Sequence, residues 1–431
     1  KESTTVKITV SQNKRTLLRD GQHFFYLADT CWSAFTSIQE NDWITYLDKR
    51  KEQGFNTLQI NVLPQWDRSR GQFDCLPFPL DAGVFDFTVW EDAYFERAQR
   101  LCKIADEKGF TLALVVLWSN YVAGTWASQL DKERNVLPED CRQAYYQKVI
   151  ATFDAFHPIY FIGGDTDFPT QPTIDTYLEA FAFFEKHSPN TLKTIHIKGR
   201  FEEIPATIVE HLDLFLYQSG HNSAFLNMPY YLAERFYQRQ PQLPIINSEP
   251  CYEQMGYARH VYGRFGQKDV RKAAWQSLLA GGAAGITYGA HGIWSWQTPT
   301  ATFAEEIGEA FDRPMIWPEA LSFPGADDYG FIKQLFELLN IQELVPCQER
   351  LIDADEQIRM AAIAGSKDAL LYLPSNTTVR LQGDLSTATV TLIDLNTNRF
   401  LKPKLTVTDG ITVFHPHNCH EDVLFVIQIK E

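Results

Sequence analysis

Hydrophobic and polar positions follow two alternating patterns over the first 340 residues. Short, continuous apolar runs predict buried strands, and the amphipathic stretches between them predict helices. Gly54 and Gly109 each follow a helical stretch directly and mark where it ends. The predicted helices span 42–53, 91–108, 139–153, 173–187, 229–239 and 269–279, and the predicted strands span 24–29, 56–63, 110–118, 159–163, 194–198, 213–217, 244–247 and 285–288.

This alternation predicts an α/β fold with a parallel sheet, because continuous apolar strands need helices on the faces of their sheet. Eight such units over about 300 residues favour a (β/α)8 TIM barrel over an open doubly wound sheet. No glycine-rich phosphate loop follows the first strand, which argues against a nucleotide-binding sheet. A short β lead-in over 6–10 and 16–18 precedes the barrel.

The pattern changes close to residue 340. Short runs, often alternating between apolar and polar residues, are separated by turns rich in Asn, Asp, Gly and Pro, which is typical of an antiparallel β-sandwich. Tyr372 and Phe414 are single rings in such runs and are expected in its core, so we expect a stabilising partner rather than an independent sugar binder. The predicted domains are therefore a barrel over 1–340 and a sandwich over 341–431, with strands at 359–364, 369–373, 379–381, 389–394, 404–407, 411–414 and 423–429.

Charge and composition exclude several classes of function. The chain has 39 Lys and Arg against 54 Asp and Glu, a net charge of −15, which argues against a nucleic acid or an anionic membrane as partner. No apolar run approaches the 18 residues of a membrane span. The chain begins at Lys1 without a Met or an apolar leader, which we interpret as a mature fragment, hence periplasmic or extracellular, although an arbitrary start would look the same.

Neither a metal nor a cofactor is expected. The seven cysteines are dispersed without a CxxC pair, and the chain has no HExxH motif. His415, His417 and His420 form the one histidine cluster, which falls in a predicted sandwich loop and is not favoured as a metal site.

Polar and aromatic residues follow the predicted strands at their C-terminal ends, where the active sites of (β/α)8 barrels lie. Each has a structural alternative, since a strand-end His is more often structural, and the Trp and amide side chains also suit the barrel core. The combination of carboxylates, amides and rings nevertheless favours a sugar pocket. The residues are Asp29, Trp32, Gln59, Asn61, Trp118, Asn120, Asp165, His196, Gln218, His221, Glu249, Tyr288, His291 and Trp294.

Two acids in this set suit catalysis. Asp165 ends the fourth strand behind Gly163 and Gly164, which would let the backbone approach a ligand closely, and Glu249 ends the seventh strand. Strands four and seven lie on opposite sides of such a barrel, so the two acids are expected to face each other. Glycoside hydrolysis needs one carboxyl that protonates the leaving oxygen and one that attacks the anomeric carbon. The alternative is that either acid caps a helix or pairs with Arg.

Six segments carry a resemblance to a known family. They are LADTCW at 27–32, QGFNTLQ at 53–59, FIGGD at 161–165, NSEPCYE at 247–253, DVRKAAW at 269–275 and TYGAHGIW at 287–294. On these motifs the chain resembles the apiosidase-like glycoside hydrolases, the group around glycoside hydrolase family 140. Its members join a (β/α)8 barrel to a small C-terminal sandwich once described as collagen-binding, and the sandwich here matches only in outline.

The resemblance implies that Asp165 is the acid/base and Glu249 the nucleophile of an exo-acting, retaining enzyme. Family members release apiose from a branched pectin and are secreted or periplasmic, although related subgroups cut other furanosides. An oligosaccharide or polysaccharide is thus the expected partner. The expected substrate contacts are Asp29, Trp32, Gln59, Asn61, Trp118, Gln218, His221, Tyr252, His291 and Trp294.

Further expectations concern geometry. Retention requires the two carboxyls to lie about 5–5.5 Å apart. Segments 64–79 and 292–317 are expected to wall a blind pocket, and Asn61, Gln218 and Tyr252 are expected to donate to Glu249 or to the sugar.

The competing functions are a catalytically silent carbohydrate-binding or scaffold protein and a collagen-binding or peptidase accessory. The presence of both acids favours the enzyme.

Overall fold

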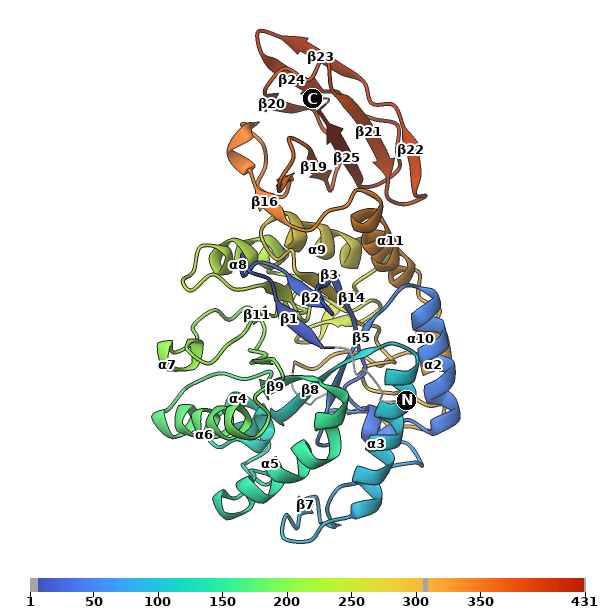
Figure 1. Ribbon diagram of the computed structural model, residues 1–431. Coiled ribbons are helices and arrows are strands. Elements are labelled where there is room, and N and C mark those ends of the chain that lie inside the picture. Colours follow the sequence, from blue (N-terminus) through green and yellow to red (C-terminus); the bar gives the residue numbers. More distant parts are fainter. Residues whose placement is uncertain (1–6, 305–308, 430–431) are drawn as a thin grey trace.

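A sheet of eight parallel strands organises the larger domain of the computed structural model, which describes residues 7–304 and 309–429 (Figure 1). The first strand pairs with the last and the order closes almost into a ring, so the predicted (β/α)8 barrel is confirmed. The order is β10 (Lys193–Thr194), β9 (Ile159–Gly164), β8 (Thr111–Trp118), β5 (Thr57–Asn61), β4 (Tyr26–Thr30), β15 (Gly285–Tyr288), β12 (Ile245–Asn247) and β11 (Phe215–Tyr217).

The seam between β10 and β11 is closed by single contacts rather than by a strand ladder. The backbone N–H of Asp213 donates to the carbonyl of Lys193 at 2.9 Å, and the hydroxyl of Thr194 donates to the carbonyl of Leu214 at 2.6 Å. The ring of strands is thereby complete, and its C-terminal ends meet at one face.

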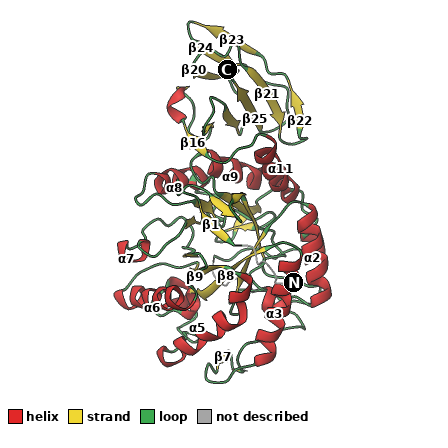
Figure 2. Cartoon of the chain, viewed as in Figure 1, coloured by secondary structure: helices red, strands yellow, loops and turns green. Residues whose placement is uncertain are grey.

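Helices cover the outside of the barrel (Figure 2). Gly54 and Gly109 adopt positive φ values of 93° and 89° directly after two of them, as their predicted role at helix ends requires. The sequence did not predict α11, because Gly325 and Gly330 weaken its helical pattern. The helices are α1 (Ala34–Ser37), α2 (Glu40–Glu52), α3 (Asp92–Glu107), α4 (Trp126–Leu130), α5 (Glu139–Phe153), α6 (Gln171–His187), α7 (Ala206–Val209), α8 (Met228–Tyr237), α9 (Gln267–Leu279), α10 (Trp317–Ala320) and α11 (Gly325–Leu338).

Small antiparallel sheets accompany the barrel. The predicted lead-in forms β1 (Ile8–Val10) and β2 (Leu17–Arg19), and its expected residue Val6 lies outside the described residues. A third strand, β3 (Gln22–Phe24), pairs with β2, so Phe24 belongs to the lead-in rather than to the first barrel strand. Two hairpins lie in barrel loops: β6 (Leu80–Asp81) with β7 (Val84–Phe85), and β13 (Gly256–Tyr257) with β14 (Val261–Arg264).

The C-terminal part forms the predicted sandwich of two antiparallel sheets. The predicted boundary at 340 lies between the end of α11 and the start of β16. Phe414 is fully buried in the sandwich core, as expected. Tyr372 is also fully buried, but its ring packs toward the barrel, 6.5 Å from that of Trp275. The larger sheet has the order β16 (Leu344–Pro346), β18 (Arg359–Ile363), β19 (Ala369–Leu373), β25 (Val423–Gln428), β21 (Thr389–Asp394) and β22 (Arg399–Leu401), and the smaller has β17 (Leu351–Ile352), β20 (Val379–Gln382), β24 (Ile411–Phe414) and β23 (Leu405–Thr408).

A buried ionic cluster joins the two domains where α9 contacts β16, β18 and β19. Arg271 of α9 donates from Nε to Asp422 Oδ2 at 3.0 Å and from Nη1 to Asp328 Oδ2 at 3.0 Å. The hydroxyl of Tyr372 also donates to Asp422, at 3.0 Å. Arg271 and Asp422 are 1% and 0% exposed, so this cation neutralises carboxylates that water does not reach.

Replacing Arg271 with Met is expected to lower the free energy of unfolding by about 3–5 kcal/mol, because it leaves Asp422 and Asp328 buried without their cation. Urea denaturation followed by circular dichroism measures the change. Arg380→Met is the matched control, because Arg380 pairs with Asp353 at 2.7 Å on the surface and is half-exposed. Equal midpoints for the two variants would contradict a stabilising role for the cluster.

None of the helices in the described ranges is both long and apolar enough to cross a bilayer.

All seven cysteines are free thiols in this structure.

Candidate active site

A cavity of about 320 Å³ lies at the C-terminal ends of the barrel strands. Its walls come from residues that follow β4, β8, β9, β11 and β12, so segments far apart in the sequence meet around one space. Eight of the predicted site residues line it: Trp32, Trp118, Asp165, Gln218, His221, Glu249, Tyr252 and Trp294.

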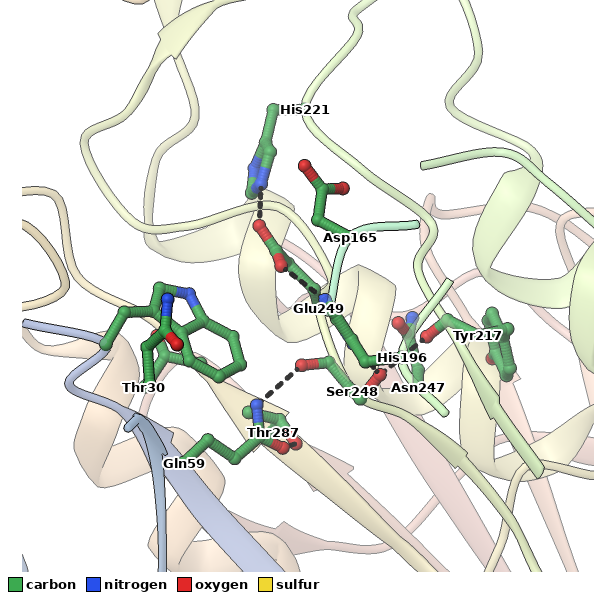
Figure 3. Close-up of polar contacts among 12 residues, drawn as sticks. Thr30, Gln59, Asp165, His196, Tyr217, His221, Asn247, Ser248, Glu249 and Thr287 are labelled. Carbon is green, nitrogen blue, oxygen red and sulfur yellow. Dashed lines mark hydrogen bonds and ion pairs between the residues drawn. The ribbon is translucent and has the colours of Figure 1, made fainter. Parts of the chain in front are cut away.

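Glu249 is held at this cavity by two imidazoles (Figure 3). The backbone N–H of Tyr252 donates to His221 Nδ1 at 3.3 Å, so the proton of this ring lies on Nε2, which donates to Glu249 Oε1 at 2.9 Å. His196 Nε2 contacts the other carboxylate oxygen at 3.0 Å. Burial alone would raise the pKa of Glu249, but the hydrogen bonds from His196 and His221, together with their electrostatic attraction, outweigh it and lower the pKa to about 2.

Asp165 has the opposite electrostatic environment. Its carboxyl lies beside that of Glu249 in Figure 3. Burial, and after it the negative charge of Glu249, raise the pKa of Asp165 well above its ordinary value. The residue adopts a left-handed backbone conformation with φ of 50°, and its carbonyl accepts a hydrogen bond from Trp126 Nε1 at 2.6 Å. This backbone conformation and this hydrogen bond fix the direction in which the Asp165 side chain points, directly after the end of β9.

Gly163 and Gly164 have a different role from the one expected. A Cβ on Gly164 would lie 2.4 Å from the ring of Trp118, and a Cβ on Gly163 would lie 2.6 Å from the ring of Tyr177. The glycines therefore make room for two aromatic side chains of the protein and not for a ligand. This corrects the sequence interpretation and explains how Trp118 reaches the cavity wall.

The two carboxyl groups thus border one cavity in different protonation states. One is ionised over the whole neutral range, and the other keeps its proton to a higher pH than an ordinary Asp. A pair divided in this way suits glycoside hydrolysis, in which one group attacks or stabilises the anomeric carbon and the other protonates the leaving oxygen.

Gln59 was expected to touch substrate, and the structure instead places it inside the barrel, outside the cavity lining. Its Nε2 donates to the carbonyl of Ser248 at 3.0 Å, and its Oε1 accepts from Tyr26 at 2.8 Å and from Thr287 at 2.9 Å. Gln59 therefore supports the residue that precedes Glu249, because it ties that backbone to two neighbouring strands.

Asp29 and His291 are corrected in the same way. Asp29 is fully buried and accepts hydrogen bonds from Arg50 Nε at 2.6 Å and from the hydroxyl of Tyr46 at 2.8 Å. Its carboxylate is therefore paired with Arg50 inside the barrel wall. His291 Nδ1 accepts from Trp294 Nε1 at 3.0 Å, and burial lowers the pKa of His291 to about 3, so this ring is neutral and orients Trp294.

Asn61 is the fourth expected contact outside the cavity lining. Its Nδ2 donates to Gln65 Oε1 at 2.9 Å, and among the described residues no hydrogen bond joins it to Glu249. Tyr252 lines the cavity, and its hydroxyl accepts from Trp32 Nε1 at 3.0 Å. His196 and His221 contact the two oxygens of Glu249, and Tyr252, as expected, also interacts with this carboxylate through a side-chain hydrogen bond.

Several residues of the site were missed by reasoning from the sequence, and the first, His196, contacts Glu249 without lining the cavity. His196 appeared among the strand-end residues but was not selected, although its place after β10 could have indicated it. The others line the cavity. Lys198 ends the predicted strand 194–198, Trp126 begins α4, and the rest lie in loops without a strand-end signal: Gln65, Asp67, Arg200, Met255, Arg259, Glu309 and Phe311. Both segments expected to wall the pocket contribute to its lining, although residues 305–308 of the second lie outside the described residues.

Within residues 7–304 and 309–429, no three His, Cys, Asp or Glu side chains are grouped as metal ligands. His415 Nε2 contacts the hydroxyl of Thr406 at 2.9 Å, and His417 Nδ1 accepts from the backbone N–H of Cys419 at 3.1 Å. These histidines therefore have structural partners in the sandwich.

Comparison with known proteins gives consistent matches. Residues 11–343 match the family described as "Apiosidase-like, catalytic domain". A solved structure of a glycoside hydrolase is similar with a TM-score of 0.78 and 19% identity, covering 99% of this chain and 98% of its own. A glycoside hydrolase family 5 protein from Bacteroides vulgatus ATCC 8482 is similar with a TM-score of 0.79 and 20% identity, covering 98% and 93%. No curated protein matches the chain.

Proposed function

Because the chain belongs to the apiosidase-like family of glycosidases, we propose that it is a retaining exo-glycosidase acting on a pectic glycan of plant cell walls. The sugar that it releases is apiose or a related furanoside at the end of a chain, and its place of action is periplasmic or extracellular. One observation carries the proposal: Glu249 and Asp165 border one cavity with pKa values displaced in opposite directions.

The reaction takes two steps on these residues. Glu249 attacks the anomeric carbon and forms a covalent bond to it, while Asp165 gives its proton to the departing glycosidic oxygen. Asp165, now ionised, then takes a proton from water, whose oxygen attacks the anomeric carbon and returns Glu249 to its carboxylate form. His196 and His221 hold both oxygens of Glu249 in place, so the attacking group is oriented before the sugar arrives.

The aromatic lining supports a sugar as the ligand. The rings of Trp32, Trp118, Trp126, Trp294 and Phe311 border the cavity. Flat apolar rings suit the C–H faces of a sugar ring, while the carboxylates and amides among them suit its hydroxyls.

The proposal is tested by incubation with a panel of pectic oligosaccharides, with product analysis and NMR of the anomeric protons in the first minutes. We expect one terminal monosaccharide, released at first with the anomeric configuration of the substrate. Internal fragments would overturn the exo assignment, and an inverted first product would overturn the double-displacement mechanism. Intact oligosaccharides throughout the panel would favour a silent binding protein.

A further inference from the structure

A third carboxylate, Asp67, borders the catalytic cavity and takes no part in the two steps above. It lies in the loop after β5, and a relay of amides supports it from the strand. Asn61 Nδ2 donates to Gln65 Oε1 at 2.9 Å, and Gln65 Nε2 donates to Asp67 Oδ1 at 2.7 Å. Asn61 and Gln65 are both buried, so this chain of hydrogen bonds fixes the carboxylate against the cavity wall.

Two other acids near the cavity have a cation as partner, and Asp67 has none among the described residues. Asp167 pairs with Lys198 at 2.7 Å, and Glu309 pairs with Arg259 at 3.3 Å. In the part of the chain that the structure describes, no Lys, Arg or His forms an ion pair with Asp67, whose side-chain hydrogen bond comes from Gln65. A carboxylate with so few donors in a partly enclosed site is costly unless a ligand supplies more of them.

Two more polar atoms of the cavity residues lack partners. Trp118 Nε1 and Gln218 Oε1 are buried atoms without a hydrogen-bond partner among the described residues, and both side chains line the cavity. Unsatisfied buried polar groups are uncommon in folded proteins and call for an explanation. The donor Trp118 Nε1 and the acceptors Gln218 Oε1 and Asp67 thus border a single cavity. They fit a ligand rich in hydroxyl groups, since a hydroxyl both donates and accepts hydrogen bonds.

Asp67 lines the same cavity as Asp165 and Glu249 and interacts electrostatically with both. The negative charge of Asp67 adds to the effects of burial and of Glu249 that raise the pKa of Asp165. Burial raises the pKa of Asp67 to about 6 against the hydrogen bond from Gln65, and the charge of Glu249 contributes to this rise. The three carboxyls thus border the same space, and a sugar lying between Asp165 and Glu249 is within reach of Asp67.

We propose that Asp67 anchors the sugar that is released, by accepting hydrogen bonds from two neighbouring hydroxyl groups of that ring. This inference rests on the proposed glycosidase function and specifies its substrate as a neutral sugar with a vicinal diol. The free carboxylate lone pairs match two adjacent O–H donors, and Gln65 keeps the group from turning away. A sugar whose own carboxylate faces Asp67 is disfavoured, because it would meet the charges of Asp67 and Glu249, while the nearby cations Lys198 and Arg259 are already paired with Asp167 and Glu309.

The test compares wild type, Asp67→Asn and a control, Asp81→Asn, which removes the same charge from an exposed position in β6. The substrates are a nitrophenyl apiofuranoside and analogues in which one ring hydroxyl is replaced by hydrogen. For Asp67→Asn we expect kcat/KM to fall about 100-fold on the full substrate, because a contact to a charged acceptor is lost. Asp81→Asn is expected to match wild type.

The analogues separate an anchor from a merely structural residue. Removing a contacted hydroxyl is expected to cost wild type about 100-fold and Asp67→Asn only about 3-fold, because the variant has already lost that contact. A variant that still discriminates as strongly as wild type overturns the inference. The pH profile gives a second readout: without the charge of Asp67, the alkaline limb set by Asp165 should move to lower pH.

Binding without turnover distinguishes failure of the inference from failure of the proposed function. Four tryptophans line the cavity, so titration with free apiose, arabinose or galacturonic acid is followed by intrinsic fluorescence. We expect a neutral sugar to bind wild type about 100-fold more tightly than Asp67→Asn. Equal affinities, tighter binding of galacturonic acid, or no binding of any sugar to wild type overturns the inference. A wild type that binds sugar and cleaves no glycoside overturns only the proposed function.

Discussion

Replacing Glu249 with Gln is expected to lower kcat by about 10⁵-fold, on natural oligosaccharides and activated aryl glycosides alike. The amide cannot attack the anomeric carbon, so no covalent intermediate forms whatever the leaving group. The hydrogen bonds from His196 and His221 do not compensate, because they orient the side chain without making it nucleophilic. Steady-state kinetics on both kinds of substrate measure the loss.

Azide separates a lost nucleophile from a damaged fold. In Glu249→Ala, azide can enter the space of the missing carboxylate and attack directly, with Asp165 still able to protonate the leaving group. We expect a glycosyl azide whose anomeric configuration is opposite to that of the substrate. A product of retained configuration would contradict the assignment of Glu249 as nucleophile, and full activity of Glu249→Gln would exclude it.

Replacing Asp165 with Asn is expected to lower kcat/KM by about 10³-fold or more on natural linkages, and by about 10-fold on nitrophenyl glycosides. A sugar alkoxide is a poor leaving group and needs the proton of Asp165, whereas nitrophenolate leaves without one. On natural linkages, wild type is active only while Asp165 holds its proton, and the raised pKa of this group lets it do so to a higher pH than an ordinary Asp. Activity should therefore fall as the pH rises through that pKa, and this alkaline limb should disappear in Asp165→Asn on the activated substrate.

Azide also tests this second assignment. With Glu249 intact, the covalent intermediate of Asp165→Asn forms on an activated substrate, and azide attacks it without the help of a base. We expect faster turnover and a glycosyl azide of retained configuration. Equal losses on good and poor leaving groups, or no rescue by azide, would mean that the roles of Asp165 and Glu249 are exchanged or absent.

The sequence by itself predicted the barrel because its strands are local features. Strands such as 110–118 are short apolar runs buried on both faces, and the helix ends at Gly54 and Gly109 depend on one residue with a positive φ. The resulting strand count and the rule that barrel active sites lie at strand ends led to Asp165 and Glu249 as candidates before any contact was known.

The environment of each side chain depends on contacts between elements that are far apart in the sequence. Asp29 and Gln59 stand at strand ends like Asp165, yet they are enclosed by Arg50 and Tyr46, and by Tyr26 and Thr287, from other elements. Those partners lie from 17 to more than 200 residues away in the sequence, so no local pattern reports them. The same holds for Gly163 and Gly164, whose missing Cβ atoms accommodate rings rather than a ligand.

The electrostatic division between the two acids has the same origin. A strand-end position tells where a carboxyl lies, but its pKa depends on the burial, charges and donors that the fold brings to it. His196 and His221 reach Glu249 from two other strand ends, and Asp67 reaches the cavity through a loop held by amides. The sequence therefore determined the scaffold and the positions of two acids, because those depend on neighbours along the chain. The tertiary structure decided which acid is charged and which polar groups face the cavity, because those depend on neighbours in space.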